Sequence, residues 1–388
     1  MKLNKTAKLI LKDGLEFEGF SFGAEKSMAG EVVFATGMVG YPEALTDPSF
    51  KGQILVLTYP LIGNYGIPKK EFWESGKIQV SGLIVCNYID TPSHHAMQMT
   101  LGEWFKKEKI PLLEIKDTRF LTQKLRDEGV SLGKIIINGK NVPFEDPNLR
   151  NLVAEMSTKK IYEVSPTPRV GRPPYPRGRE EKTIVLIDCG AKLNIVRSIV
   201  KRGFKVVVVP FDTDVTKLNF SFSAVIISNG PGDPEKVKAT ISNVRKIIAK
   251  KIPILGICLG NQILTLACGG STYKLKFGHR SQNQPVIENK TNKSVCASRC
   301  YLTTQNHGFA VERIPKDFIE WFHNANDNTN EGIIHKSLPI MSVQFHPESS
   351  PGPLDTDWVF DYFLEKAGLH PSPTPPLVKG RGEGVRLN

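Results

Sequence analysis

The chain has 388 residues and a mass of 43.1 kDa, a length that suits two ordinary domains better than one. Its 40% hydrophobic and 23% charged residues exclude a disordered chain, and no uninterrupted apolar run approaches the roughly 18 residues that cross a membrane. The net charge is +12, but a third of that excess falls in residues 158–182, where 7 basic residues stand against 3 acidic ones. We therefore expect a solvated basic segment rather than a nucleic-acid-binding surface, since no stretch interleaves arginines with aromatic residues.

Residues 1–157 predict an N-terminal domain of mixed α/β structure. Two alternating stretches flank Asp13-Gly14, which is typical of a β-hairpin. The helix that we expect after Thr118 has this residue as its N-terminal cap and ends at Gly129. In chain order the predicted elements are strands at 8–12, 15–20, 54–59 and 82–85 and helices at 100–109 and 118–127.

Residues 158–182 predict a linker, because five prolines fall within 165–178 and almost nothing there can be buried. Residues 183–368 then alternate continuous Val/Ile runs with helical patterns, which indicates a doubly wound parallel sheet covered on both faces. We expect residues 369–388 to be a disordered tail. The predicted strands lie at 183–188, 205–210, 224–228, 252–257 and 340–345, and the helices at 193–202 and 237–250.

The cysteines indicate a reducing compartment. Six cysteines are too few for a disulfide framework in a chain of this length. No apolar stretch follows the first six residues, so the sequence contains no pattern typical of a secretory signal. We expect a cytoplasmic protein with free thiols and no membrane partner.

One cysteine lies in a pattern that predicts a nucleophile. Gly256-Ile-Cys258-Leu-Gly260 follows a buried strand and precedes an apolar helix, the context of a nucleophile elbow with sulfur in place of oxygen. The backbone N–H groups and the dipole at a helix N-terminus favour a thiolate there. By itself the motif fits a buried structural cysteine equally well.

A nucleophilic cysteine needs a base and a group that orients the base. Phe345-His346-Pro347-Glu348 follows the last predicted strand, so it ends at the same edge of the parallel sheet as Cys258. His346 could take the thiol proton, and Glu348 could hold its other ring nitrogen. A structural histidine is the alternative, and the combination of elbow and His-x-Glu favours the triad.

Acyl transfer also needs donors for a developing oxyanion. The stretch from Ser228 to Pro234 follows a predicted strand and contains two glycines and two prolines, which describes a rigid loop that a ligand can approach closely. Its amides and the N–H of Leu259 are candidates for the oxyanion hole. A turn that binds nothing is the alternative.

Residues 183–366 resemble the triad-type (class I) glutamine amidotransferases through Asn229-Gly-Pro-Gly-Asp-Pro, Gly256-Ile-Cys-Leu-Gly-Asn-Gln and His346-Pro-Glu348. Two further motifs, Asp188-Cys-Gly-Ala-Lys-Leu-Asn-Ile and Gln305-Asn-His-Gly-Phe-Ala, narrow the resemblance to the small, glutamine-hydrolysing subunits of carbamoyl-phosphate synthetase. The N-terminal half contributes Gly30-Glu-Val-Val-Phe, Thr36-Gly-Met-Val-Gly-Tyr, Leu45-Thr-Asp-Pro-Ser and Leu57-Thr-Tyr-Pro.

The resemblance implies a role for each matching position. Cys258 would form a glutamyl thioester, with His346 as acid and base and Glu348 as its partner. Ser49 would bring the N-terminal domain into the substrate site. The residues implied to bind L-glutamine are Ser49, Gly230, Gly232, Leu259, Gln262, Asn306, Gly308 and Phe309.

Three positions depart from the family pattern. Asn261 stands where a histidine is usual, and we expect a modest effect on the polarity of the pocket. Cys189 replaces an aromatic residue, which we interpret as a packing change. Ser281-Gln282 replace small glycines, so the local structure of that loop is not predicted.

The chain contains neither a phosphate-binding Gly-x₄-Gly-Lys-Ser/Thr loop nor a Gly-x-Gly-x-x-Gly fingerprint. Cys296 and Cys300 have no second close pair, so we expect no metal site and no cofactor in this chain. The resemblance implies that ammonia passes to a large synthetase subunit, bound as a heterodimer or larger assembly. That subunit would use ATP, Mg²⁺ and bicarbonate to make carbamoyl phosphate for arginine and pyrimidine synthesis.

Three other functions remain open at this stage. The chain could serve a different synthase, which the family-specific N-terminal half disfavours. It could be a non-catalytic interaction subunit that stabilises a large partner, although such a subunit would have no need of Cys258. A nucleic-acid binder would draw on the positive charge, but residues 1–157 are balanced at 19 basic and 19 acidic residues.

Overall fold

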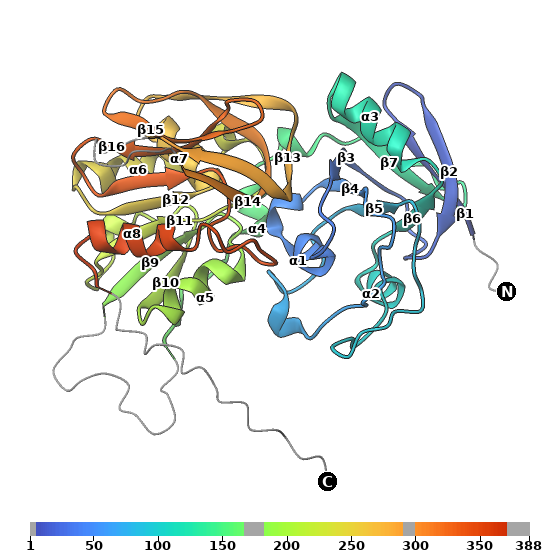
Figure 1. The fold of residues 1–388 in the computed structure, drawn as a ribbon, viewed down its shortest axis with the longest axis horizontal. Helices are drawn as coiled ribbons and strands as arrows, with labels where there is room; N and C mark the ends of the chain where they lie inside the picture. Colours follow the sequence, from blue (N-terminus) through green and yellow to red (C-terminus); the bar gives the residue numbers. More distant parts are fainter. Residues whose placement is uncertain (1–4, 167–181, 290–298, 371–388) are drawn as a thin grey trace, which may run out of the picture.

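The computed structural model describes residues 5–166, 182–289 and 299–370. In these ranges it folds as two domains side by side, an N-terminal barrel and a C-terminal sheet flanked by helices (Figure 1). Among the described helices, none combines the length and the apolar character that a membrane span requires.

The N-terminal domain is a closed barrel whose strands follow the order β1-β2-β6-β5-β4-β3-β7. The predicted hairpin is confirmed, since β1 and β2 pair antiparallel with Leu9 opposite Phe17. The strands from β3 to β6 pair in parallel, and the barrel closes through antiparallel pairs that β7 makes with β1 and β3. The strands are β1 (Lys5–Leu11), β2 (Glu16–Ser21), β3 (Met28–Ala35), β4 (Gln53–Leu57), β5 (Gly82–Val85), β6 (Leu112–Ile115) and β7 (Ser131–Ile137).

Two apolar clusters hold the barrel, because alternate residues of a strand point to opposite faces of its sheet. One cluster takes side chains from all seven strands and from α3 (Thr118–Glu128). The other joins four of the strands to α1 (Tyr41–Thr46) and α2 (Leu101–Glu108). The N-terminal cap of α3 was wrongly predicted: Asp117, not Thr118, accepts the capping hydrogen bond, from the N–H of Phe120.

The C-terminal domain has a ten-stranded sheet in the order β14-β13-β15-β16-β17-β12-β11-β9-β10-β8. Its centre, from β17 to β10, is parallel, as the Val/Ile runs predict. The predicted doubly wound core is therefore present. The central strands are β9 (Thr183–Asp188), β10 (Lys205–Pro210), β11 (Ala224–Ile227), β12 (Ile254–Ile257) and β17 (Ile340–Val343).

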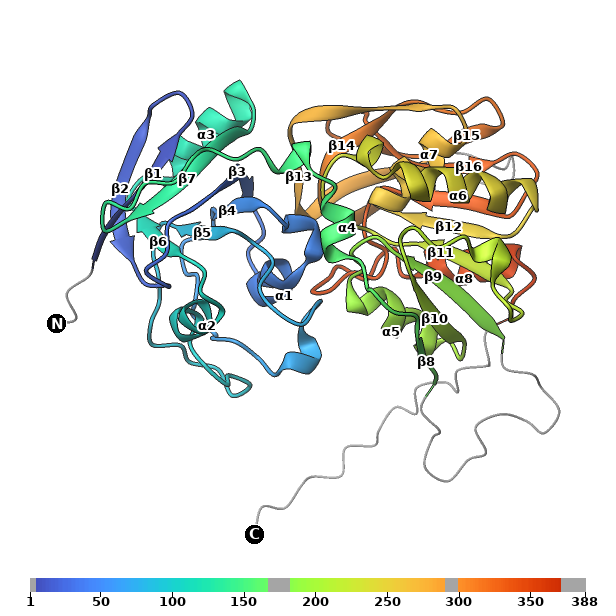
Figure 2. The ribbon, with the colours of Figure 1, turned by 180° about the vertical axis from the view of Figure 1, so that it is seen from behind.

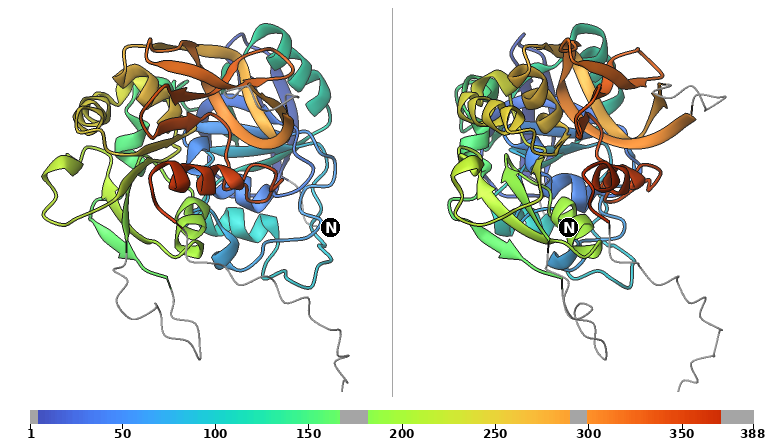
Figure 3. Two further views of the ribbon diagram at one scale, coloured as in Figure 1. Left: turned by 60° about the vertical axis from the view of Figure 1, so that its left-hand side comes forward. Right: turned by 90° about the vertical axis from the view of Figure 1, so that its left-hand side faces the viewer.

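Helices cover both faces of this sheet (Figure 3). On one face α5 (Leu193–Lys201) and α8 (Trp358–Lys366) bury Ile199 and Phe360 against it. On the other face α6 (Lys238–Ala249) and α7 (Leu259–Ala267) bury Ile247 and Ile263. Apolar burial of about 25 cal/mol per Å² on both faces makes this domain a rigid support for the loops at its strand ends.

An antiparallel extension of the sheet was not predicted. Its strands are β13 (Ser271–Glu288), β14 (Arg299–Arg313), β15 (Phe318–Asn324) and β16 (Asn330–His335). The backbone N–H of Thr36 in the barrel donates to the carbonyl of Arg280 in β13, so this extension reaches the N-terminal domain.

The predicted linker is partly wrong. Within 158–182, β8 (Tyr162–Val164) pairs antiparallel with β10 and forms one edge of the large sheet. Just before it, α4 (Leu152–Met156) contributes Val153 to the core of the C-terminal domain (Figure 2). The rest of the linker prediction, residues 167–181, and the tail beyond residue 370 lie outside the described residues.

A buried carboxylate joins the two domains. Glu74 of the N-terminal domain is fully buried and accepts hydrogen bonds from the N–H of Asn194 at 3.1 Å and from Ser350 Oγ at 2.6 Å. Its backbone carbonyl accepts from the N–H of Leu193 at 2.9 Å. Glu74 thus engages the free amides at the start of α5, where the helix itself offers no acceptors.

The contact between α7 and β11 leaves no space for a side chain at Gly260. A Cβ atom there would lie 2.2 Å from the carbonyl oxygen of Ile227. We expect Gly260→Ala to lower the free energy of unfolding by about 2–3 kcal/mol, measured by urea titration, because backbone must move. Gly76→Ala is the control, since its Cβ would meet only Lys70 Nζ, at 3.9 Å. Equal stability of the two variants would contradict this packing.

Candidate active site

Cys258 occupies a strained turn between β12 and α7. Its φ of 54° and ψ of −103° form a conformation that a residue with a side chain rarely adopts. Its N–H donates to the carbonyl of Val343 at 2.8 Å, which ties the turn to β17. The flanking glycines are required sterically, because a Cβ atom at Gly256 would lie 2.6 Å from the carbonyl oxygen of Gly260. The sequence-predicted elbow is therefore present.

His346 and Glu348 form a buried pair beyond the end of β17. His346 Nδ1 lies 2.7 Å from Glu348 Oε1, and both side chains are fully buried. Lys192 Nζ lies 3.0 Å from the same oxygen, Glu348 Oε1. Burial alone raises the pKa of Glu348, but Lys192 and His346 outweigh it and bring that pKa well below its ordinary value. Glu348 is therefore a carboxylate that holds the ring of His346.

The other ring nitrogen of His346 faces the cysteine. Burial alone lowers the pKa of His346, whereas Glu348 and then Cys258 raise it, and the net pKa lies above its ordinary value. The side chain of Cys258 is a hydrogen-bond partner of the His346 ring and helps to raise this pKa. The buried Nε2 has no closer partner in the described ranges. The Cys258 thiol donates a long hydrogen bond, 3.7 Å, to the carbonyl of Asn306. A thiol with an imidazole nitrogen as its neighbour is the arrangement that proton transfer requires.

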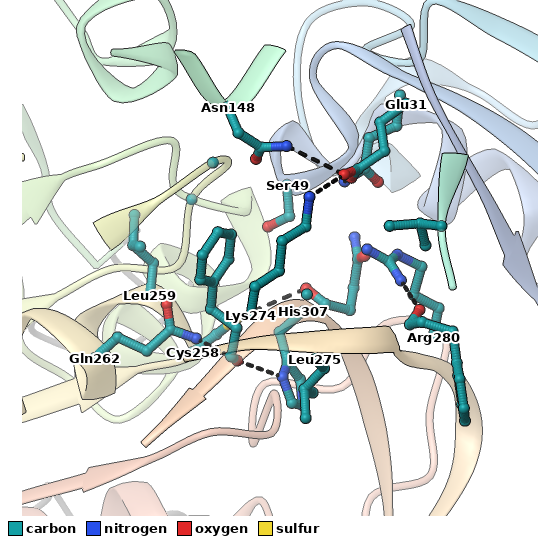
Figure 4. A pocket seen from close by; sticks show the side chains of 18 residues that line it. Glu31, Ser49, Asn148, Cys258, Leu259, Gln262, Lys274, Leu275, Arg280 and His307 are labelled. Carbon is teal, nitrogen blue, oxygen red and sulfur yellow. Dashed lines mark hydrogen bonds and ion pairs between the residues drawn. The ribbon is translucent and has the colours of Figure 1, made fainter. Parts of the chain in front are cut away.

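A pocket opens above Cys258 between the two domains (Figure 4). The structure brings all eight sequence-predicted substrate residues to its lining, from both domains. Besides Cys258 these are Ser49, Gly230, Gly232, Leu259, Gln262, Asn306, Gly308 and Phe309.

A second buried carboxylate fixes the part of the pocket that crosses the domain boundary. Asp47 accepts hydrogen bonds from the N–H of Ser49 and from Asn306 Nδ2, each at 2.9 Å. Asn229 Nδ2 donates to Ser49 Oγ at 3.0 Å. Ser49 is therefore held in the pocket by Asn229 of the loop after β11 and, through Asp47, by Asn306 of β14.

The sequence analysis missed several polar residues that line the pocket. Lys274 of β13 forms an ion pair with Glu31 of β3, with Lys274 Nζ 2.5 Å from Glu31 Oε1. Asn148 Nδ2 donates to the same oxygen at 3.1 Å. Arg280 of β13 also lines the pocket, and Figure 4 shows its side chain beside these groups. Charged residues within strands were the available signal, because an inward charge in a strand needs a partner or a ligand.

Two of the departures from the family pattern now have structural explanations. Asn261 was expected to affect the polarity of the pocket, but it does not line it. Instead its buried side chain donates to Gln344 Oε1 at 3.1 Å and accepts from Ser342 Oγ at 2.7 Å, beneath α7. Cys189 is fully buried among apolar side chains, which agrees with a packing change.

Three buried residues beside the pocket have the composition of a metal site. The ligand atoms of His279, His307 and Glu331 lie within 4.8 Å of one another. However, His279 Nε2 lies 2.9 Å from Asp327 Oδ2, and its Nδ1 lies 3.4 Å from Glu331 Oε1. Burial alone lowers the pKa of His279, but the two carboxylates raise it to about 9. In the described structure these contacts make the cluster an ion-pair network of His279 with two carboxylates. Of the other cysteines considered, Cys300 is exposed and Cys296 lies outside the described residues.

The fold and the pocket define an α/β protein of the amidotransferase class, with a cysteine on a strand-to-helix elbow and a buried His–Glu pair beside it. The family model described as "Glutamine amidotransferase class-I" matches residues 185–366, and the model described as "Carbamoyl-phosphate synthase small chain, CPSase domain" matches residues 9–135. The chain belongs to the carbamoyl-phosphate synthase small-chain family.

Three relatives show the extent of this similarity. The arginine-specific small chain of carbamoyl phosphate synthase from Saccharomyces cerevisiae is 46% identical over 92% of this chain and 88% of its own length. The multifunctional protein CAD of Squalus acanthias is 49% identical over 97% of this chain, which spans only 17% of that protein. The mitochondrial carbamoyl-phosphate synthase [ammonia] of Homo sapiens is 44% identical over 98% of this chain, which spans 25% of that protein.

Solved structures also match the C-terminal half. A glutamine amidotransferase from Thermotoga maritima superposes with a TM-score of 0.36 at 22% identity, over 50% of this chain and 88% of its own length.

The ion pair of His279 predicts a pH dependence of stability. Because its pKa is raised from 6.5 to about 9 in the folded state, its contribution is complete below pH 6.5 and is lost as the pH rises through 9. We expect the difference in Tm between the wild type and His279→Gln to shrink by roughly 5 °C from about pH 6 to about pH 10, as about 2 kcal/mol is lost. Calorimetry over this range tests it. A difference that stays constant with pH would mean that His279 is neutral in the folded protein.

Proposed function

We propose that the chain hydrolyses L-glutamine and delivers the ammonia to a large, ATP-dependent carbamoyl-phosphate synthetase subunit. The observation that carries this proposal is the position of Cys258, on its strained turn with His346 beside it, at the base of a pocket lined by residues of both domains. Membership of the small-chain family does not depend on the catalytic mechanism described below.

The chemistry begins with transfer of the Cys258 thiol proton to His346 Nε2. The thiolate attacks the side-chain amide carbon of glutamine, and the carbonyl oxygen becomes an oxyanion. We assign the N–H of Leu259 as one donor, because the first amides of a helix have no acceptor within it. The second is the N–H of Gly230, in the loop after β11 that lines the same pocket. The imidazolium then protonates the amide nitrogen, the C–N bond breaks, and ammonia leaves a glutamyl thioester on Cys258.

Water then hydrolyses the glutamyl thioester, with His346 again acting first as a base and then as an acid. His346 takes a proton from a water molecule, which attacks the thioester carbon. The C–S bond breaks, the thiolate of Cys258 recovers its proton from His346, and glutamate leaves. Glu348 stays ionised throughout, because Lys192 and the imidazolium both stabilise its charge.

The proposal includes a large synthetase partner, which membership of the small-chain family supports. That subunit would bind ATP, Mg²⁺ and bicarbonate and form carbamoyl phosphate. One relative of this chain is named an arginine-specific small chain of carbamoyl phosphate synthase, and another is named a multifunctional protein.

Sequence identity alone does not decide the nitrogen source. One relative, 44% identical over 98% of this chain, carries "[ammonia]" in its name. A subunit that only stabilised a large partner would need neither a strained cysteine nor an imidazole nitrogen next to it. Backbone strain of about 1–3 kcal/mol at Cys258 therefore supports glutamine hydrolysis over the interaction subunit.

Cys258→Ser tests the nucleophile. In the complex with the large subunit we expect glutamine-dependent carbamoyl phosphate synthesis to fall by at least ~10³-fold, while synthesis from added ammonia stays at the wild-type rate. Cys268→Ser is the matched control, because Cys268 lies at the other end of α7. Full glutamine use by Cys258→Ser would rule out the thioester.

His346→Asn and Glu348→Gln test the base and its orienting partner. We expect His346→Asn to lower kcat for glutamate release by roughly 10²–10⁴-fold, because general acid–base catalysis is lost. The loss in Glu348→Gln should be smaller, since an amide still positions the ring. Wild-type kcat in His346→Asn would remove the histidine from the mechanism.

A further inference from the structure

A chain of buried side-chain amides lies beneath α7 and ends at the pocket. Gln344 directly follows β17 and is fully buried. Its Oε1 accepts hydrogen bonds from Asn261 Nδ2 and from Gln262 Nε2, each at 3.1 Å. Gln262 lies on α7 and lines the same pocket as Cys258, whereas Gln344 does not line it. Gln344 therefore contacts a pocket residue from behind.

One backbone carbonyl fixes the direction of every hydrogen bond in this chain. Gln262 Nε2 lies 2.8 Å from the carbonyl oxygen of Phe309 in β14, and a carbonyl oxygen can only accept. The atom of Gln262 at this contact is therefore the amide nitrogen, and the atom of Gln344 that meets it is an oxygen. Because that oxygen cannot donate either, the atom of Asn261 beside it is again a nitrogen. Asn261 Oδ1 then accepts from Ser342 Oγ at 2.7 Å.

The consequence is that Gln262 offers the pocket an acceptor. Its Nε2 has two protons, and Phe309 and Gln344 take one each. Its Oε1 accepts no hydrogen bond from the described residues and is not fully enclosed by them. Figure 4 shows this amide among the pocket side chains, next to Leu259. An oxygen fixed in this way is suited to an N–H donor of a substrate.

Stability by itself does not explain a glutamine at position 344. Gln344 Nε2 is buried and has no hydrogen-bond partner among the described residues. An unpartnered buried amide is destabilising, and an apolar side chain of similar size would avoid that cost. The oxygen of the same amide is used twice, so we interpret the oxygen as the reason for a glutamine there.

We propose that Gln344 is a positioning residue for glutamine hydrolysis, which holds the amide of Gln262 in one plane and one orientation. Two hydrogen bonds from a single NH₂ group fix the rotation of that amide. With the bond to Phe309 alone, the amide could turn and present a proton to the pocket. Asn261 has the same role one step further away, because its Nδ2 holds Gln344 Oε1 in place. The proposal rests on the proposed function and adds residues that act through Gln262.

Gln344→Met and Gln344→Glu separate the oxygen from the bulk of the side chain. In the complex with the large subunit we expect Gln344→Met to raise KM for glutamine by roughly 10-fold, with kcat within about 2-fold of the wild type, because one hydrogen bond that aligns Gln262 is lost. Gln344→Glu keeps an acceptor oxygen, so its KM should stay within about 3-fold of the wild type.

Two results of this comparison would overturn the proposal. One is an unchanged KM in Gln344→Met. The other is a fall in kcat alone, because Gln344 lies two residues before His346 and would then act on the base.

Double-mutant cycles show whether Gln344 acts through Gln262. In a Gln262→Met background, Gln344→Met should leave KM unchanged, because the amide that it positions is absent. Asn261→Asp replaces the donor to Gln344 by an acceptor, so it should raise KM by a factor similar to that of Gln344→Met, without a further increase when the two are combined. Additive effects in either cycle would contradict a role through Gln262.

Further measurements keep folding and the proposed function apart from this proposal. Synthesis from added ammonia shows that a variant is folded and assembled, and Asn261→Asp carries the test if Gln344→Met fails this criterion. Asn243→Leu is the control for loss of a buried amide, since Asn243 Nδ2 donates to the carbonyl of Asp212 at 2.8 Å on α6, and its KM should match the wild type.

Protection of Cys258 from iodoacetamide by glutamine measures binding without turnover. This protection should weaken in Gln344→Met and stay at the wild-type level in Asn243→Leu. Equal protection of Gln344→Met and the wild type would refute the positioning role. A wild-type complex that glutamine protects but that releases no glutamate would overturn the proposed function instead.

Discussion

The positions of His346 and Lys192 in the active site both depend on the buried carboxylate of Glu348. Oε1 of this buried side chain lies 2.7 Å from His346 and 3.0 Å from Lys192, so one negative charge orients the imidazole and neutralises the lysine. Lys192 directly precedes α5, whose first amides bond to Glu74 of the N-terminal domain. A buried charge without these partners would cost several kcal/mol, so the histidine, the helix start and the domain contact depend on one another.

The same dependence makes the pocket a property of both domains. The C-terminal domain contributes the elbow and the glycine loops, and the N-terminal domain contributes Ser49 and Glu31. Asp47 bonds to Asn306 across the boundary, and Glu31 pairs with Lys274 across it. Each of these contacts buries a charged or polar group that would be unsatisfied in an isolated domain. The barrel is therefore part of the active site as well as a neighbour to it.

Different parts of the fold differed in how well the sequence predicted them. The central strands β9 to β12 were located to within two residues, because continuous Val/Ile runs between helical patterns have few other interpretations. The strands β13 and β14 were missed, since polar residues such as Lys274 and Arg280 interrupt their apolar pattern and their pocket-facing residues meet the other domain. The edge strand β8 was read as linker for a related reason: with three residues, only pairing to β10 makes it a strand.

The sequence by itself determined the local chemistry of the protein. The spacing of Gly256-x-Cys258-x-Gly260 predicts the elbow, because a sharp turn between a strand and a helix needs glycines. The position of His346-x-Glu348 after a parallel strand predicts that it lies at the same edge of the sheet as Cys258. Only the tertiary structure decided which charges are paired. That Glu348 meets Lys192, that Asn261 turns away from the pocket, and that Arg280 keeps free donors all follow from contacts between residues distant in sequence. Burial and pairing are properties of the packed chain, and no local pattern encodes them.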